Sequence, residues 1–380
     1  MANTLTNLIP SAYRALNVVS RELVGFIPSV QLDPSSATIA QNQNIFIPAA
    51  PVNAAGKNIT AAMSIPTIAD QTIATTTHTL SKARAFPFSW SGEEVLSVNQ
   101  GPGYLSLQEQ QIAQAIRAAV NEIEVDIAVA AKNGASRAFG TTAGTAPVLA
   151  DWAQAKKILD DNGAPMSDRT SVFNTTAGVA LRNTSNLFKV NEAGDAGLLR
   201  QGALGSLYGF NLRESAQIQS TTAGAMTGAL VNGALAIGAT AVVFDTGTVN
   251  TTGIVAGDII TFAGDTNKYV VTTGLAAVSG TITIAAPGLR QAAADNVAIT
   301  VFATSARNTA FSRNAILLST RLPASTPDDM ATDRQVITDP NSGISFELAM
   351  YPGYRMVHYE VGLCWGVTVI KPEHLAVIIG

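Results

Sequence analysis

The glycine-rich stretch "RQGALGSLYGFNLRESAQI" (residues 200–218) has the composition of a phosphate-binding loop, because Gly202, Gly205 and Gly209 fall within eight residues. A P-loop requires Lys and then Ser or Thr directly after its last glycine, whereas Phe210 follows Gly209. A dinucleotide-binding loop leads into a helix, but the residues after Gly209 alternate as in a strand. The spacing also differs from the G-x-S-x-G of a nucleophile elbow. We therefore predict a structural turn at the three glycines, with Gly205 or Gly209 at positive φ or in close backbone contact.

The histidines and the main acidic segment do not form a recognisable catalytic or metal-binding set either. His78, His358 and His374 lie in separate segments without a His or Cys at metal-ligand spacing, so we expect each to be structural. The segment "TPDDMATDRQVITDPNSG" (residues 326–343) lacks a glycine and a terminal glutamate at the spacing of a calcium loop, and we expect it to be a solvated loop. The sequence thus predicts no catalytic residues, no metal and no cofactor, and a protein that is not an enzyme.

Glu93 and Glu94 form a carboxylate pair, but no partner base accompanies them, which argues against acid–base catalysis. We expect them instead to form an ion pair with Lys82 or Arg84, or with a neighbouring chain. The single cysteine, Cys364, lies in the apolar segment "EVGLCWGV" and is expected to be a buried structural thiol.

The composition indicates a chain that hides much of its surface against other chains. Only 13% of the 380 residues are charged, 47% are apolar and the mean hydropathy is +0.23. A net charge of −4 provides no basic surface for gripping nucleic acid. The N-terminal residues lack a basic region followed by an apolar core, and no segment has the length and hydropathy to span a bilayer. We therefore expect a protein that stays in the cytoplasm where it is made and has no membrane partner.

The elements that must position these residues change character along the chain. Residues 3–25 have a helical pattern, whereas residues 35–90 are rich in Pro, Asn and Thr and have no wide apolar face. We interpret the latter as a long β-hairpin that lies on another surface, the alternative being a disordered linker. Residues 104–134 form the clearest helix, because Ile112, Ile116 and Ile123 belong to one apolar stripe. A helix of this length spans a whole domain, and its alanine content argues against a coiled coil.

The second half of the chain alternates and then loses its helical period. Residues 151–220 alternate helix and strand patterns, which predicts a small α/β unit. Residues 221–305 contain short strands separated by Gly, Asn and Asp, which is typical of a small antiparallel barrel. Because apolar strand character resumes after residue 305, the barrel appears as an insertion into the α/β unit. Two long strands that pair through "YPGY" and one short strand close the chain.

This order of elements resembles that of bacteriophage major capsid proteins of HK97-like fold, in particular the P22 coat protein-like family with an inserted domain. Three stretches carry the resemblance: "GALGSLYGFNLRESAQI", the barrel segment "IVAGDIITFAG" (residues 254–264) and the closing segment "LCWGVTVIKPEHLAVI" (residues 363–378). The resemblance implies an α+β fold with seven parts. These are an N-terminal arm (1–34), an extended loop (35–92), a peripheral domain with the spine helix 104–134 (93–150), an apical domain in two parts (151–220 and 306–345), an inserted β-barrel (221–305) and closing strands (346–380).

The resemblance also implies a function without catalysis. The chain would assemble into hexamers and pentamers of an icosahedral phage head that encloses double-stranded DNA without sequence-specific binding. Its partners would be other copies of itself, a scaffolding protein and a portal, and it would be assembled in the bacterial cytoplasm and end in the virion. Some relatives of this fold form an isopeptide crosslink from a lysine near the loop tip, a position that Lys57 occupies here. The candidate contacts between subunits are Lys57, Lys82, Arg84, Phe86, Phe88, Trp90, Glu93 and Glu94.

Two other functions fit parts of the sequence. The Thr- and Gly-rich strands are also typical of a surface or fibre-like β protein, although the long helix speaks against one. An α/β enzyme with a β-insertion would need a nucleophile, metal or cofactor set, and we recognise none.

Overall fold

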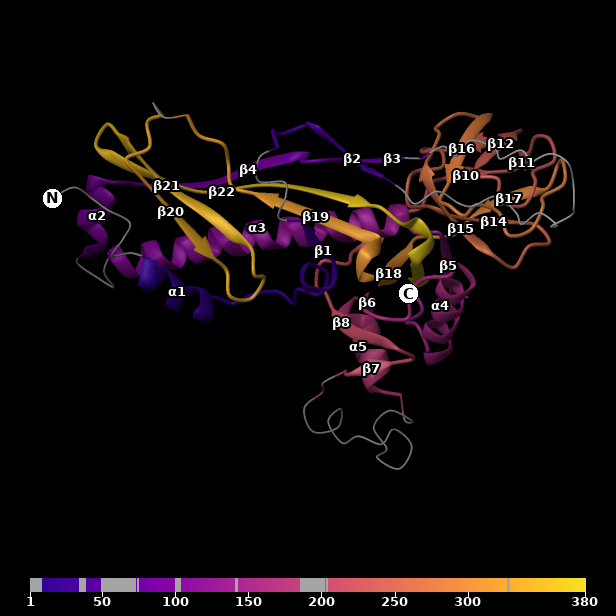
Figure 1. Cartoon of the computed structure of the whole chain (residues 1–380), viewed down its shortest axis with the longest axis horizontal. Helices are drawn as coiled ribbons and strands as arrows, with labels where there is room; N and C mark the ends of the chain where they lie inside the picture. Colours follow the sequence, from indigo (N-terminus) through magenta and orange to yellow (C-terminus); the bar gives the residue numbers. More distant parts are fainter. Residues whose placement is uncertain are drawn as a thin grey trace, which may run out of the picture.

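The computed structural model describes residues 9–33, 39–48, 73, 75–99, 104–140, 143–184, 202, 204–326 and 329–380. Helix α3 (Tyr104–Gly134) is the long axis of the molecule, and its bounds are those the apolar stripe predicted. A six-stranded sheet lies along it, the helix α1 (Ile9–Val18) packs on it, and a β-barrel lies near its C-terminal end (Figure 1). An α/β unit extends to one side of this axis, so that the molecule has three arms (Figure 1).

The six-stranded sheet is built on the long strand β22 (Met356–Val369). Strand β4 (Lys82–Ser91) pairs with one side of β22, from Met356↔Ser91 to Trp365↔Lys82. Two strands lie end to end on its other side: β21 (Ser345–Gly353) and β19 (Ile316–Arg321). The outer strands β20 (Asp333–Thr338) and β1 (Gln31–Asp33) pair with β21 and β19 respectively.

The apolar stripe of α3 packs against this sheet and makes one core. Its members Ile112, Ile116, Ala119, Ile123 and Ile127 have no exposed surface. They share the core with residues of β21 and β22 and with Phe26, Ile27 and Val30 of the N-terminal segment. Burial of apolar area on this scale is the main stabilising term for such a layer.

The α/β unit has a core of its own. Its sheet runs β5–β23–β18–β6–β8–β7, and Trp152 packs edge-on against Phe173 between this sheet and its helices. Its strands are β5 (Arg137–Phe139), β6 (Arg169–Phe173), β7 (Ser206–Leu207), β8 (Phe210–Glu214), β18 (Ser305–Ser312) and β23 (Leu375–Ile379). Its helices are α4 (Leu149–Asp161) and α5 (Thr175–Arg182), the latter capped by Asn174, whose Oδ1 accepts from Ala177 N.

The inserted antiparallel barrel is confirmed. Its six strands close because β14 pairs with both β15 and β17. The strands are β11 (Ala229–Val231), β12 (Ala241–Asp245), β14 (Ile259–Phe262), β15 (Lys268–Thr273), β16 (Gly280–Ile284) and β17 (Ala298–Val301). The chain enters through β9 (Ser220–Thr221) and leaves through β18, and these two strands pair with each other, Thr221 opposite Ser305. One further pair, β10 (Met226–Thr227) with β13 (Thr248–Val249), lies beside it.

Two expectations about segments of the chain were wrong. Residues 326–343 are not simply a solvated loop, because β20 forms inside this segment and Asp339 at its end is fully buried. Asp339 accepts from Arg21 Nη1 at 2.7 Å and from Ser342 Oγ at 2.7 Å. Residues 82–91 are not a coreless hairpin either, since β4 is a full strand of the six-stranded sheet.

The hairpin that does form before β4 is shorter than expected. It pairs β2 (Asn44–Pro48) with β3 (Thr75–Thr79), and we call it the β2–β3 ribbon. This ribbon is a two-stranded sheet separate from the two larger ones. The rest of the segment between its strands, where Lys57 lies, is outside the described residues apart from residue 73.

The barrel should fold without the rest of the chain, because its core of fifteen buried residues is its own. We expect residues 222–304 expressed alone to give a β-type circular dichroism spectrum and a cooperative melt. Phe244→Ala in the same fragment should abolish or greatly lower the melt, since truncating a fully buried Phe costs roughly 3–5 kcal/mol. A wild-type fragment with a disordered spectrum would show that the barrel depends on its contact with α3 and β5.

Candidate interaction surfaces

A buried carboxylate fixes the N-terminal segment to α3. Glu124 has no exposed surface, and its two oxygens accept from the backbone N–H groups of Gly25 (2.6 Å), Phe26 (2.7 Å) and Ile27 (3.1 Å). Burial raises the pKa of Glu124, while these three N–H groups and the Ser215 hydroxyl act in the opposite direction. The side chain therefore caps a turn far away in sequence and holds residues 25–27 in place.

A second carboxylate holds the residues just before this turn. Glu22 accepts from Arg117 Nε at 2.8 Å and from Asn121 Nδ2 at 2.7 Å, both on α3. The hydrogen bond from Arg117 lowers the pKa of Glu22 to about 2. Sequence reasoning missed both carboxylates. The available signal was the position of Glu124 inside the apolar stripe, four residues after Val120 and three before Ile127.

Four of the predicted contact residues line one groove between β4 and α3, or lie beside it. Arg84, Phe86 and Phe88 line it together with Gln111 and Gln114 of α3, and its volume is about 480 Å³. Trp90 lies two residues further along the same strand and donates its indole N–H to Gln111 Oε1 at 2.7 Å. We call this hollow the β4–α3 groove.

The aromatic side chains of β4 also contribute to the core of the chain. Phe86, Phe88 and Trp90 are half-buried against it, and Phe88 stacks on Tyr359 with ring centroids 5.3 Å apart. Their role in contacts between subunits stays a prediction.

We predicted that Glu93 or Glu94 pairs with Lys82 or Arg84, and within one chain this prediction was wrong. Lys82 Nζ lies 2.8 Å from Asp126 Oδ1 and 3.4 Å from Glu122 Oε1, and Arg84 Nε lies 3.1 Å from Glu122 Oε1. Both partners belong to α3. Pairing with α3 follows from the sheet register, which places the N-terminal half of β4 over the middle of that helix.

Glu93 and Glu94 instead lie at the start of helix α2 (Gly92–Asn99). Glu94 accepts from the backbone N–H of Ser91 at 2.8 Å, which lowers its pKa, and Ser91 Oγ accepts in turn from Glu94 N. This reciprocal arrangement is a capping box. Glu93 is exposed in the first turn of the same helix.

The glycine turn joins β7 and β8 through two residues at positive φ, Tyr208 at 50° and Gly209 at 83°. Such a pair is the two-residue hairpin turn that favours glycine. Gly202 also has positive φ, 65°, and its carbonyl accepts from Arg182 Nε at 3.0 Å. At Gly205 the φ is not in this region and an added Cβ would meet nothing within 4 Å.

The histidines occupy three different environments. His78 is fully buried, with Nδ1 2.8 Å from Thr368 Oγ1 and Nε2 2.8 Å from Ser319 Oγ. Burial lowers the pKa of His78 and also that of His374. His358 lies on β22 opposite Ser89. Among the described residues there is no group of three or more His, Cys, Asp or Glu that could hold a metal ion.

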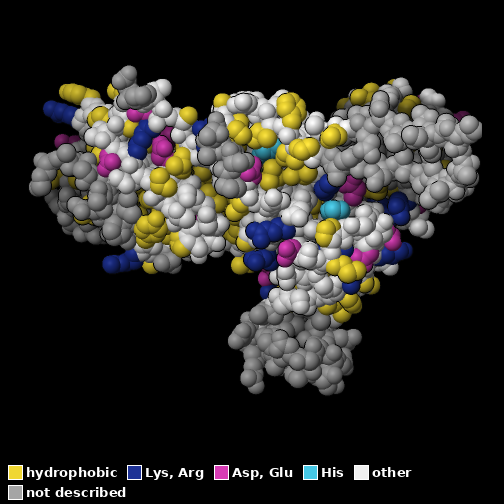
Figure 2. Space-filling view, in the orientation of Figure 1, with side chains coloured by type: hydrophobic (Ala, Val, Ile, Leu, Met, Phe, Trp, Pro, Cys, Tyr) yellow, Lys and Arg dark blue, Asp and Glu magenta, His cyan; other side chains and the backbone are white. Residues whose placement is uncertain are grey.

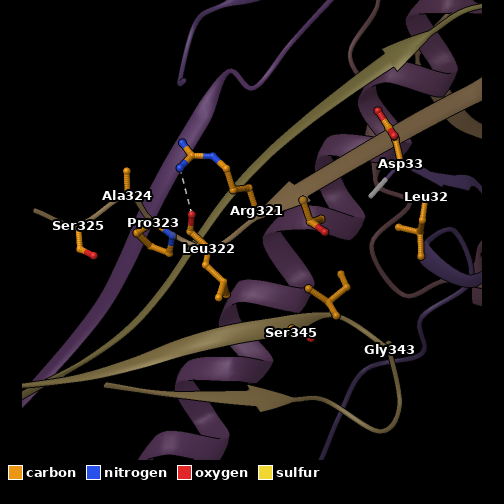
Figure 3. A pocket seen from close by; sticks show the side chains of 11 residues that line it. Leu32, Asp33, Arg321, Leu322, Pro323, Ala324, Ser325, Gly343 and Ser345 are labelled. Carbon is orange, nitrogen blue, oxygen red and sulfur yellow. Dashed lines mark hydrogen bonds between the residues drawn. The ribbon is translucent and has the colours of Figure 1, made fainter. Parts of the chain in front are cut away.

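A hollow of about 830 Å³ lies where β19 and β21 meet end to end on β22, between the outer strands β1 and β20. Its lining includes one acid and one base, Asp33 and Arg321, with Leu32, Pro323 and Ser345 among its other residues. Figure 3 shows Asp33 apart from Arg321, whose guanidinium donates to the carbonyl of Leu322 at 3.2 Å. The lining offers no nucleophile with an adjacent base.

The free end of the six-stranded sheet exposes apolar side chains. Tyr354 in the β21–β22 turn is 88% exposed, Leu105 at the start of α3 is 63% exposed and Leu96 of α2 is 61% exposed. In the space-filling view, apolar side chains are also scattered over the rest of the visible face, together with separate groups of charged side chains (Figure 2). Scattered apolar residues are normal on a protein surface, whereas a contiguous apolar patch marks a binding site.

No family model and no curated protein matches the chain. Solved structures do match it. A chain of Mycobacterium phage Che8 has a TM-score of 0.53 at 15% identity, covering 95% of this chain and 92% of its own length. A chain from the capsid of the cyanophage P-SCSP1u has a TM-score of 0.54 at 11% identity, with coverage of 95% and 89%. The expected phage capsid fold is thus confirmed. None of the described helices has the length and hydropathy that crossing a membrane requires.

We expect Glu124→Ala to destabilise the chain strongly, because three backbone N–H groups would be left buried without an acceptor. Each such group costs roughly 1–3 kcal/mol, so the loss in the free energy of unfolding should be about 3 kcal/mol or more. Urea unfolding of the unassembled protein measures it. Glu109→Ala, at a half-buried position of the same helix, is the matched control and should cost well under half as much. Equal effects of the two substitutions would contradict the capping role of Glu124.

Proposed function

We propose that this chain is the major capsid protein of a bacteriophage, with HK97-like fold, and that it self-assembles into hexamers and pentamers of an icosahedral head. The observation that carries the proposal is a fold shared along 95% of the chain with a chain of a phage capsid. In this role the protein acts by packing and not by catalysis. The head would enclose double-stranded DNA, with a scaffolding protein and a portal as further partners, and assembly would take place in the bacterial cytoplasm.

The domain layout we propose follows the elements described above. The N-terminal arm would be residues 1–34, and the extended loop 35–92 would end in the sheet strand β4. Helix α3 would be the spine of the peripheral domain, 93–150. The six-stranded sheet that packs on it would combine the closing strands β21 and β22, mainly within 346–380, with β4 of the extended loop, β1 of the N-terminal arm, and β19 and β20. The α/β unit would form the apical domain, for which we propose residues 151–220 and the start of 306–345 as far as the end of β18, because β19 and β20 of that range lie in the six-stranded sheet. Its turn at Gly205 and Gly209 would face the axis of the capsomer.

The β2–β3 ribbon supports an extended loop that reaches a neighbouring subunit. A two-stranded ribbon by itself is marginally stable in water. Phe46 in β2 is 63% exposed, so the ribbon presents a large apolar side chain without a core to receive it. In a shell, this side chain and the free edges of the ribbon would be covered by the next subunit.

The β4–α3 groove is a candidate surface on which a neighbouring subunit would bind. It combines half-buried aromatic side chains with the exposed Arg84 and with glutamines that can donate and accept. Aromatic residues and Arg are the types enriched in protein interfaces. We propose that Lys82, Arg84, Phe86, Phe88, Trp90, Glu93 and Glu94 contact the neighbouring subunit, and that Lys57 does so near the loop tip.

The acidic composition suits a wall that encloses DNA without binding it tightly. Strong binding to the phosphate backbone needs clustered Lys and Arg, whereas the whole chain has a net charge of −4. A fibre-like surface protein remains the second candidate, favoured by the strand-rich barrel, and shells or fibres in the microscope would distinguish the two.

Phe46→Ser should leave the melting temperature of the monomer within a few degrees of wild type, because Phe46 is mostly exposed in the single chain. It should strongly reduce particle formation, because the same side chain is buried only on association. Sedimentation velocity measures the amounts of monomer and of particles for the variant and for wild type. Ile237→Ser, which changes an equally exposed apolar side chain on the barrel, is the control and should assemble as wild type.

The assembly claim for the ribbon fails if Phe46→Ser forms normal particles. If the variant is unfolded as a monomer, Phe46 belongs to an intrachain core instead. Replacement of residues 50–62 by a short Gly/Ser linker tests the loop tip in the same assay, with the same expected loss of particles.

A further inference from the structure

A small cavity lies where the barrel joins the rest of the molecule. Its walls come from the last turns of α3, from residues 217–221 leading into β9, and from Arg307 of β18. Its volume is about 80 Å³, which is room for a few waters or for one small ion. The place is structurally central, because β9 and β18 are the strands through which the chain enters and leaves the barrel.

Two cations line this cavity. Lys132 of α3 donates from Nζ to Thr221 Oγ1 at 3.2 Å. Arg307 is only 2% exposed and donates from its two terminal nitrogens to Ser305 Oγ and, at 3.5 Å, to the carbonyl of Ala303. Its Nε is buried and has no hydrogen-bond partner among the described residues. Nε itself has almost no accessible surface and is out of reach of a ligand in the cavity, but an acceptor bound beside Arg307 and Lys132 would offset the cost of burying the Arg307 charge.

The acid nearest to these cations is occupied by other donors. Asp258 is fully buried, and its carboxylate accepts from the backbone N–H groups of Val255 (2.8 Å) and Gly224 (3.1 Å). Asp258, Lys132 and Arg307 together carry a net charge of +1 where the barrel joins α3. Burial lowers the pKa of Arg307 to about 10 and lowers that of Lys132, the latter also through the charge of Arg307. Burial is the main cause of both shifts, because it disfavours the charged forms, and the charge of Asp258 opposes both.

We propose that this cavity is a binding site for one small free oxyanion, with inorganic phosphate as the physiological ligand. A guanidinium matches the oxygens of such an ion in geometry, and an ammonium adds a point charge. Ser220 and Thr221 contribute hydroxyl groups to the same walls. The cavity has no room for the two sugars that flank a phosphodiester, so a free oxyanion fits it better than the backbone of DNA does.

A bound oxyanion would connect α3 to both strands at the base of the barrel. It would neutralise the excess charge of Lys132 and Arg307 and fix the barrel against the helix. Because an ion that binds only the native state stabilises it, the effect should appear in the unassembled chain. The proposal is therefore independent of the capsid function.

The test is the thermal melting of the full-length, unassembled protein against increasing sodium phosphate, with sodium chloride added to keep the ionic strength constant. We expect a saturable rise of several degrees in wild type and one phosphate per chain by isothermal titration calorimetry. Lys132→Met should lose the saturable rise and keep only the weak, unsaturated effect that phosphate exerts on any protein. Lys157→Met, which removes an exposed lysine of α4, is the matched control and should respond as wild type.

Equal, unsaturated rises in wild type and in Lys132→Met would overturn the proposal. Arg307→Gln tests the buried donor directly, and Lys132→Met covers the case in which the Arg307 variant does not fold. A short single-stranded oligonucleotide replaces phosphate in a parallel titration. A rise that depends on Lys132 in that titration would contradict the assignment to a small free oxyanion.

Discussion

The carboxylate of Glu124 joins three segments that are far apart in sequence. It lies in the middle of α3 and accepts from the backbone of residues 25–27, and the Ser215 hydroxyl also bonds to it. A carboxylate buried without such donors would be prohibitively costly, so the local conformation of all three segments is coupled. The turn at residues 25–27 places Phe26, Ile27 and Val30 in the core between α3 and the six-stranded sheet. The central part of the molecule depends on this one capping interaction.

The barrel obeys a different constraint. Its main core is separate from those of the central sheet and the α/β unit, while Ile259 of β14 and Val270 of β15 pack into the central core instead. What it requires of the rest is a fixed attachment, which the pairing of β9 with β18 and of β15 with β5 provides. The half-buried Lys132 and the buried Asp258 and Arg307 gather at this attachment, where α3, β9 and β18 meet.

Sequence patterns predicted the parts of the fold that depend on local period. Regular spacing of apolar residues over a short stretch of sequence predicted the limits of α3, the positions of the barrel strands and the hairpin of β21 and β22. Partnerships across the fold could not be predicted in this way. Lys82 and Arg84 pair with Glu122 and Asp126 only because the β4–β22 register sets them over α3, and the burial of Asp339 depends on Arg21, more than 300 residues away in the chain. The proposed oxyanion site likewise depends on residues that are far apart in sequence, Lys132 and Arg307.

We propose that a chain with this fold and this sparse charge associates into a closed shell, and cryo-electron microscopy of the protein expressed in bacteria, in lysate and after purification, is the direct test. We expect icosahedral particles whose subunits are related by five-fold and quasi-six-fold axes, with the β2–β3 ribbon lying on a neighbouring subunit. Monomers alone, or open fibres without closed particles, would contradict it.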